Sequence, residues 1–132
     1  MDFQELVRRP HAALWEPNAD LVIDEAARRI VVRVELAGVE PESLRAFVDE
    51  RQLIISGRRA ETMRLRDGSL LQKEIPDGEF IKRMHLPVSV QYGEVTATYV
   101  DGMLTIALPL AASEYIPVMR TEIHVIVKRI LA

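Results

Sequence analysis

The chain has 132 residues, no cysteine, and 17 Lys and Arg against 20 Asp and Glu, which gives a net charge of −3. This length suits one domain with a single hydrophobic core, and the lack of cysteine excludes disulfides and thiol chemistry. The slightly acidic balance argues against nucleic acid as a partner, because domains that bind it concentrate basic residues on one face. The N-terminus lacks the basic region and following apolar run of a secretory signal, and no apolar stretch approaches the ~18 residues of a transmembrane helix. The sequence therefore predicts a cytoplasmic protein with no membrane partner.

Residues 1–19 are predicted to form an N-terminal arm. Asp2 and Glu5 have the spacing of a helix capping box, and Pro10 would end that helix. The arm carries apolar side chains that would gain free energy on burial against another protein: Phe3, Leu6, Val7, Leu14 and Trp15. The alternative is that these side chains cover one end of the folded domain.

Residues 20–110 are expected to form that domain, an all-β sandwich. Apolar and polar residues alternate over several short stretches, as they do along half-buried strands. The alternating stretches cover residues 29–36, 44–48, 95–99 and 104–108, residues 53–57 are a short apolar strand, and residues 80–86 read as a strand ended by Pro87. Asp101-Gly102 separates the last two and predicts a tight β-hairpin, since both positions tolerate a positive φ. Many short strands with turn signals between them are typical of a sandwich.

Residues 60–77 interrupt this pattern with a long connection. It is charged and contains Asp67-Gly68, yet it also carries apolar residues, namely Met63, Leu65, Leu70 and Leu71. A connection of this length in a compact β domain is usually functional or carries structure of its own.

Residues 111–132 are predicted to form a C-terminal extension with two apolar parts. Pro117 cannot donate to a sheet ladder, so Ile116-Pro117-Val118 can belong only to an edge strand or a docked strand. Residues 123–131 alternate and are rich in β-branched side chains, which favours a strand, although a helix with one apolar face is the competing form. Because an exposed strand of this kind promotes aggregation, we expect this part to pair with a sheet edge or to dock on another subunit.

No catalytic, cofactor or metal site is predicted. His11, His85 and His124 lie far apart in sequence, and no pair has the spacing of metal ligands. The sequence contains neither a phosphate-binding loop nor a nucleophile-elbow motif. We therefore expect no enzymatic activity.

Six segments carry a family resemblance. The hairpin at 97–104 resembles the A-x-x-x-n-G-x-L signature of the small heat-shock proteins, the α-crystallin-domain family. Five further segments resemble that family's motifs: 15–20 (W-x-P-x-x-D), 34–39 (V-E-L-P-G-V, with Ala37 in place of proline), 53–59 (L-x-I-x-G-x-R), 78–87 (G-x-F-x-R…L-P, with Lys82 at the arginine position) and 116–118 (I-x-I/V). Their order along the chain is also that of the family.

The resemblance implies an immunoglobulin-like sandwich (an α-crystallin domain) that binds unfolding proteins without ATP. The length of residues 60–77 is similar to that in the bacterial and plant branch, in which this loop carries a strand that is exchanged to make a dimer. The loop residues expected to take part are Met63, Arg64, Leu65, Leu70 and Leu71.

The resemblance also implies a role for the tail. Ile116, Pro117 and Val118 would dock in a groove of a neighbouring subunit and hold larger assemblies together. The groove would be lined by Leu44, Ala46, Val48, Val95, Ala97 and Tyr99. The alternative is that Ile116 and Val118 pack as an ordinary last strand on their own sheet.

The function predicted from the sequence is therefore that of an ATP-independent holdase. Its partners would be unfolded client proteins, bound by the apolar side chains of the N-terminal arm, and itself, as a homodimer and a larger homo-oligomer. The alternative is a CS-domain cochaperone or protein-interaction module of the same sandwich type. Such modules are typically monomeric and lack both the long loop and the I-x-V tail.

Overall fold

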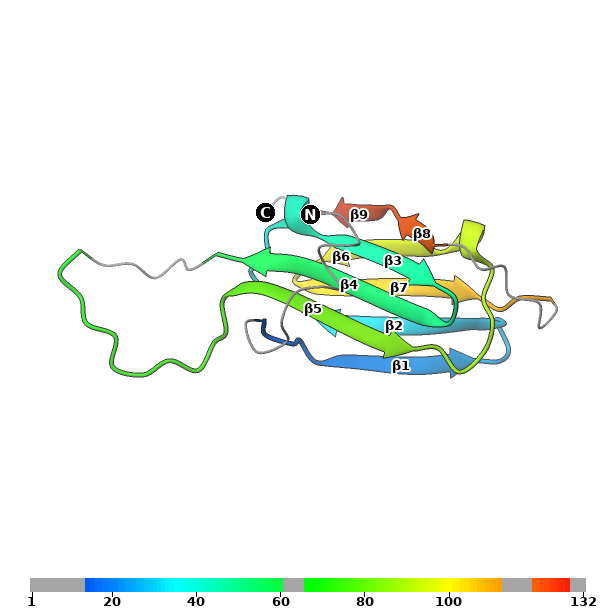
Figure 1. Ribbon diagram of the computed structural model, residues 1–132, viewed down its shortest axis with the longest axis horizontal. Coiled ribbons are helices and arrows are strands. Elements are labelled where there is room, and N and C mark those ends of the chain that lie inside the picture. The colour runs from blue at the N-terminus through cyan, green and yellow to red at the C-terminus, as the bar shows by residue number, and fades with distance from the viewer. Residues whose placement is uncertain (1–13, 61–65, 113–119, 129–132) are drawn as a thin grey trace.

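The computed structural model describes residues 14–60, 66–112 and 120–128 (Figure 1). Two sheets pack face to face, with strand orders β1-β2-β7-β6-β9 and β5-β4-β3-β8. This confirms the predicted all-β sandwich; the elements are β1 (Ala19–Asp24), β2 (Arg29–Glu35), η2 (Pro41–Ser43), β3 (Arg45–Asp49), β4 (Gln52–Arg59), β5 (Gly78–His85), η3 (Tyr92–Glu94), β6 (Thr96–Val100), β7 (Met103–Pro109), β8 (Arg120–Ile123) and β9 (Val125–Lys128).

Buried and more exposed side chains alternate along β2 and β7, and the buried ones form the core between the sheets. In the antiparallel pair of β2 and β7, Ile30 lies opposite Leu108, and Val32 lies opposite Ile106. All four side chains are fully buried. The intervening residues of both strands are more exposed, so one face of this sheet supplies the core and the other meets solvent.

The tight hairpin between β6 and β7 forms as predicted. Asp101 and Gly102 have φ values of 52° and 76°, which suit a two-residue turn between twisted strands. The Gly102 carbonyl accepts a hydrogen bond from the Leu36 amide at 2.7 Å. A Cβ added at Gly102 would lie 3.0 Å from the Ala37 Cα, so the turn also needs glycine for close packing.

β1 has no counterpart among the predicted strands. It pairs with β2 in register Ala19↔Val34 to Asp24↔Arg29 and, within the described residues, forms an edge of its sheet. Its burial does not alternate cleanly, and Val22 is 56% exposed. An edge strand with an irregular burial pattern gives no clear period-2 signal in the sequence.

The four-stranded sheet is apolar on its outer face as well. Phe47, Ile54 and Ile81 form a second buried cluster there, and Leu14 packs against it. β3 and β4 therefore carry buried side chains on both faces, which explains why β4 reads as a continuous apolar run.

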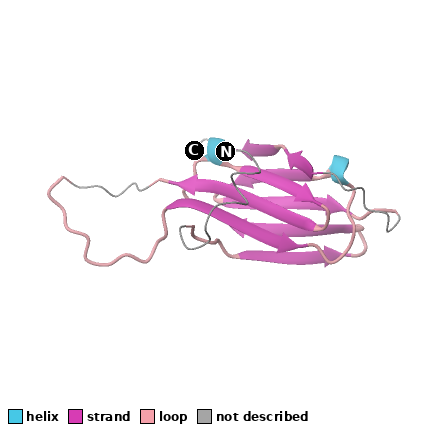
Figure 2. Cartoon of the chain, in the orientation of Figure 1, coloured by secondary structure: helices cyan, strands magenta, loops and turns pink. Residues whose placement is uncertain are grey.

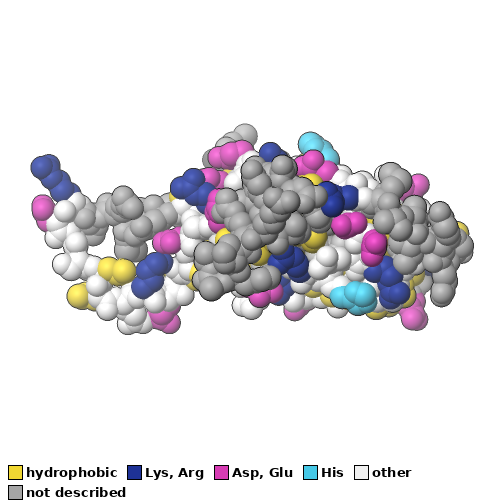
Figure 3. Space-filling view, viewed as in Figure 1, with side chains coloured by type: hydrophobic (Ala, Val, Ile, Leu, Met, Phe, Trp, Pro, Cys, Tyr) yellow, Lys and Arg dark blue, Asp and Glu magenta, His cyan; other side chains and the backbone are white. Residues whose placement is uncertain are grey.

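Between β4 and β5 the described residues 66–77 extend away from the sandwich as a loop (Figures 1 and 2). Figure 3 shows apolar side chains on this projecting loop and a mixture of both charge signs on the visible face of the body. Leu70, Leu71 and Ile75 are 68%, 94% and 69% exposed. None of the described segments contains a helix long and apolar enough to span a membrane.

Candidate subunit and client surfaces

Residues 120–128, which we name the C-terminal cap, join the two sheets at one side of the sandwich. β8 pairs antiparallel with β3, placing Ile123 opposite Ala46. β9 pairs parallel with β6, placing Val125 opposite Ala97. The chain changes sheets at His124, and the cap is the orange-to-red segment of Figure 1.

The cap is anchored by apolar side chains at this crossover. Ile123 is 5% exposed and belongs to the main core, and Val125 packs against that core while partly buried. Burying an isoleucine contributes about 1.5–3 kcal/mol. Ile126 and Val127 of β9 are 47% and 37% exposed, so the anchor is confined to Ile123 and Val125.

Two ion pairs flank the anchor. The Arg120 Nε lies 3.8 Å from Asp49 Oδ2, and the Arg45 Nε lies 3.9 Å from Glu122 Oε1. The side chains of both pairs are partly exposed to solvent. Such pairs contribute only ~0–1 kcal/mol each, so they orient the cap more than they hold it.

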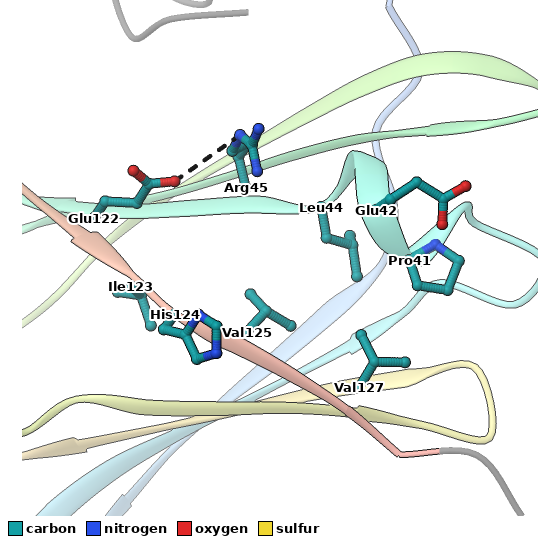
Figure 4. A pocket seen from close by; sticks show the side chains of 9 residues that line it. All are labelled: Pro41, Glu42, Leu44, Arg45, Glu122, Ile123, His124, Val125 and Val127. Atoms are coloured by element: carbon teal, nitrogen blue, oxygen red, sulfur yellow. Dashed lines mark ion pairs between the residues drawn. The ribbon is translucent and has the colours of Figure 1, made fainter.

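A cavity of about 820 Å³ lies where β8 leaves β3 (Figure 4). Figure 4 shows Leu44 on one side of it and Val125 and Val127 on the other, with the Arg45–Glu122 pair at the rim. The lining residues are Pro41, Glu42, Leu44, Arg45, Glu122, Ile123, His124, Val125 and Val127. The cap therefore leaves an open space between its own strand β9 and the segment formed by η2 and the start of β3.

The cap lies on the two strands that the sequence predicts as walls of a tail-docking groove. Of the predicted lining residues, Leu44, Ala46, Val48, Ala97 and Tyr99 are buried in the core, and Val95 packs partly against it. Ile116, Pro117 and Val118 lie outside the described residues. Ile123-His124-Val125 lies in this groove. The sequence predicts only that this segment pairs with a sheet edge or docks on another subunit, although its I-x-V spacing matches that of Ile116-Pro117-Val118.

Beside β5, at the opposite edge of the four-stranded sheet from β8, Trp15 is built into the fold. Its Nε1 donates to the Gly78 carbonyl at 3.0 Å, and its ring centroid lies 5.0 Å from that of Phe80. The Arg59 Cζ lies 4.2 Å above the Trp15 ring. Together with Leu14, which packs on the outer cluster, Trp15 ties the end of the arm to the sandwich, whereas Phe3, Leu6 and Val7 lie outside the described residues.

Arg59 also fixes the base of the long loop. Its Nη1 donates to the Pro76 carbonyl at 2.7 Å, and its Nε donates to the Ala37 carbonyl at 2.9 Å. Leu70 and Leu71, two of the residues predicted to take part in strand exchange, lie farther out on the loop and are exposed to solvent. Met63, Arg64 and Leu65 lie outside the described residues.

Residues 22–128, which run from β1 to the end of the cap, match the Hsp20/alpha crystallin family. The chain belongs to this family of small heat-shock proteins. It is 30% identical over 104 residues to the 17.6 kDa class I heat shock protein of Helianthus annuus, a match covering 78% of this chain and 68% of that protein. Small heat shock protein C4 of Rickettsia felis is 30% identical over 96 residues, covering 73% of this chain and 58% of that protein.

The fold agrees with the family. The crystal structure of hspA from Xanthomonas axonopodis has a TM-score of 0.66 to this small heat-shock protein at 25% identity. That match covers 75% of this chain and 97% of the other. Membership places the chain among chaperones of a non-enzymatic family.

The titration of two tyrosines in this small heat-shock protein fits a structural role. Burial raises the pKa of Tyr99, whose hydroxyl donates to the Leu36 carbonyl at 2.5 Å. Burial, together with Asp49 and Glu50, raises the pKa of Tyr92, whose hydroxyl donates to the Glu50 carbonyl. Both hydroxyls stay protonated at neutral pH; Tyr99 ties β6 to the segment after β2, and Tyr92 ties η3 to the turn between β3 and β4. In the ranges that the structure describes, no three metal-ligating side chains gather.

Proposed function

We propose that this small heat-shock protein is a cytoplasmic, ATP-independent holdase that binds exposed apolar surface on unfolding proteins and so suppresses their aggregation. The observation that carries the proposal is the match of residues 22–128 to the Hsp20/alpha crystallin family. Apolar exposure supports it: among the described residues, the most exposed large apolar side chains are Val22, Leu70, Leu71 and Ile75, on β1 and the long loop, and Ile126 on β9. Apolar surface gains free energy on burial whatever the partner's sequence, which suits a chaperone with many clients.

The N-terminal arm supplies the client-binding side chains in this proposal. Phe3, Leu6 and Val7 stand in the part of the arm that precedes the Trp15 anchor. Leu14 and Trp15 would contact clients only after they leave their contacts with the sandwich. An arm anchored at one end offers apolar side chains without detaching from the domain.

The subunit partner is a second copy that exchanges residues 60–77. Leu71 is almost fully exposed on the loop, and Val22 is more than half exposed on β1, an edge within the described residues. An edge strand with apolar side chains is an aggregation hazard unless another strand covers it. Pairing of the loop from one copy with β1 of the other would cover both Leu71 and Val22.

Larger assemblies would form through Ile116-Pro117-Val118. Support comes from the groove between β3 and β6, which accepts a segment of the same I-x-V spacing from its own chain. Each such contact is weak, but several at once hold an assembly while any one of them can open.

The holdase proposal is tested with a heat-labile enzyme warmed in the presence of the protein, while light scattering follows aggregation. We expect suppression at equal mass, unchanged by ATP, and none from the same mass of serum albumin. Failure to suppress, or a strict need for ATP, contradicts the proposal. Native mass spectrometry separates it from the CS-domain alternative, which predicts a monomer.

A further inference from the structure

The cap closes the groove of its own subunit. β8 continues the four-stranded sheet beyond β3, and β9 continues the five-stranded sheet beyond β6. The Ile123 side chain fills the space between the sheets opposite Ala46. Another strand cannot pair with β3 at Ala46–Asp49 while β8 is there.

The cap is nevertheless loosely held. Ile123 is the only residue of the described segment 120–128 that is classed as buried. Ile126 and Val127 point substantially into solvent, and the cavity beside Leu44 and Val125 leaves the groove incompletely filled. A different apolar segment that fills this space better could displace the cap.

The chain carries a second segment of matching spacing just before the cap. Ile116-Pro117-Val118 repeats the I-x-V pattern of Ile123-His124-Val125. Only one residue separates Val118 from Arg120, the first residue of β8, so the two can be at most about 7 Å apart. A chain that places Val118 in a neighbour's groove therefore cannot keep Arg120 beside its own Asp49, unless the two grooves lie side by side.

We propose that the cap is an intramolecular lock on assembly: it occupies the groove that would otherwise receive Ile116-Pro117-Val118 of a second copy. Because the link between Ile116-Pro117-Val118 and the cap is short, docking of these three residues in a neighbour pulls the cap out of its own groove. A subunit that donates its triplet to a neighbour withdraws its own cap and frees its own groove for the next subunit. Assembly beyond the dimer is then cooperative. This inference rests on the proposed role of Ile116-Pro117-Val118 in assembly.

The test uses a fluorescein-labelled peptide of residues 113–119 and measures its binding to the full chain by fluorescence anisotropy. All proteins carry Ile116→Ser and Val118→Ser, which removes competition from the chain's own triplet. We expect weak binding to this background protein and at least about tenfold tighter binding when Ile123→Asp is added, because the groove is then open in most molecules. Ile126→Asp, which puts the same charge on an exposed position of β9, is the matched control and should leave binding unchanged.

Because the Ile123→Asp variant could misfold, a second protein with an open groove is tested beside it. It ends at Met119 and lacks the cap altogether, and its far-ultraviolet circular dichroism shows whether the sandwich is intact. A peptide with serine in place of Ile116 and Val118 should not bind to either opened protein. Equal binding of the native peptide to closed and opened proteins overturns the lock.

Absence of peptide binding to every protein overturns the lock together with the tail-docking proposal. The holdase proposal is tested separately, because aggregation suppression by the unmodified chain does not depend on this peptide. The two failures are therefore distinguishable.

Discussion

Ile123 lies directly opposite Ala46 across the β3–β8 pair, and its buried side chain connects a C-terminal segment to the centre of the sandwich. Both residues belong to the main hydrophobic core. One contact between residues far apart in the sequence thus makes the C-terminal cap part of the domain core.

Replacing Ile123 with alanine should lower the free energy of unfolding by about 2 kcal/mol, near the low end for buried isoleucine because the site lies at a sheet edge. Urea unfolding at fixed protein concentration measures the change. Ile126→Ala, on the exposed face of β9, should change stability by less than about 0.5 kcal/mol. Equal effects of the two substitutions would mean that Ile123 does not anchor the cap.

Gly102→Ala should destabilise the protein by about 1–3 kcal/mol. The backbone has φ 76° at this position, and the new Cβ would press on the Ala37 Cα at 3.0 Å. Gly93→Ala is the matched control, because Gly93 has no positive φ and a Cβ there meets nothing within 4 Å. Thermal unfolding compares the two variants, and a Gly102→Ala variant as stable as Gly93→Ala would contradict the assigned turn.

Tyr99 should make stability fall at alkaline pH. Burial raises its pKa in the folded state above 10.0, so above that pH the unfolded chain loses the proton first and unfolding becomes more favourable. The contribution is complete below about pH 10 and declines as pH rises toward the folded-state pKa. Tyr99→Phe should flatten this decline in urea unfolding measured from pH 8 to 11. A decline of unchanged slope would show that other groups cause it.

If the proposed strand exchange forms a dimer, deleting residues 63–71 should yield monomers, because the deletion removes Leu70, Leu71 and the centre of the loop that would be exchanged. Multi-angle light scattering measures the mass, and circular dichroism checks that the sandwich remains. The milder Leu70→Ser, Leu71→Ser double variant should weaken the dimer without shortening the loop. Strand exchange through this loop is wrong if the deleted protein stays dimeric.

The sequence predicts most of the sandwich because core strands such as β2 and β7 alternate strictly and β4 is a short, continuous apolar run. Ile30, Val32 and Val34 of β2 each face the core, and the matching pattern in β7 follows a turn with an unmistakable Asp-Gly signal. β1 lacks such a pattern because only part of one face is covered. Local patterns therefore find strands that are buried on one whole face and miss a strand such as β1, which is only partly covered.

The extension was harder to predict for a different reason. Period-2 alternation runs unbroken through Ile123, Val125 and Val127, which predicts one strand. The structure confirms strands here but divides the segment at His124, with Ile123 on β8 and the two valines on β9. The alternation does not show that β8 pairs with β3 and β9 with β6, because that pairing depends on how far apart β3 and β6 lie.

The most direct test of the chaperone account is to isolate a complex with a heated client. The protein and a heat-labile enzyme are warmed together after residual ATP has been removed with apyrase, and the soluble fraction is separated by size-exclusion chromatography. The account predicts that the client elutes with the small heat-shock protein in one large soluble species. A client found only in the pellet, with the small heat-shock protein eluting alone, would contradict it.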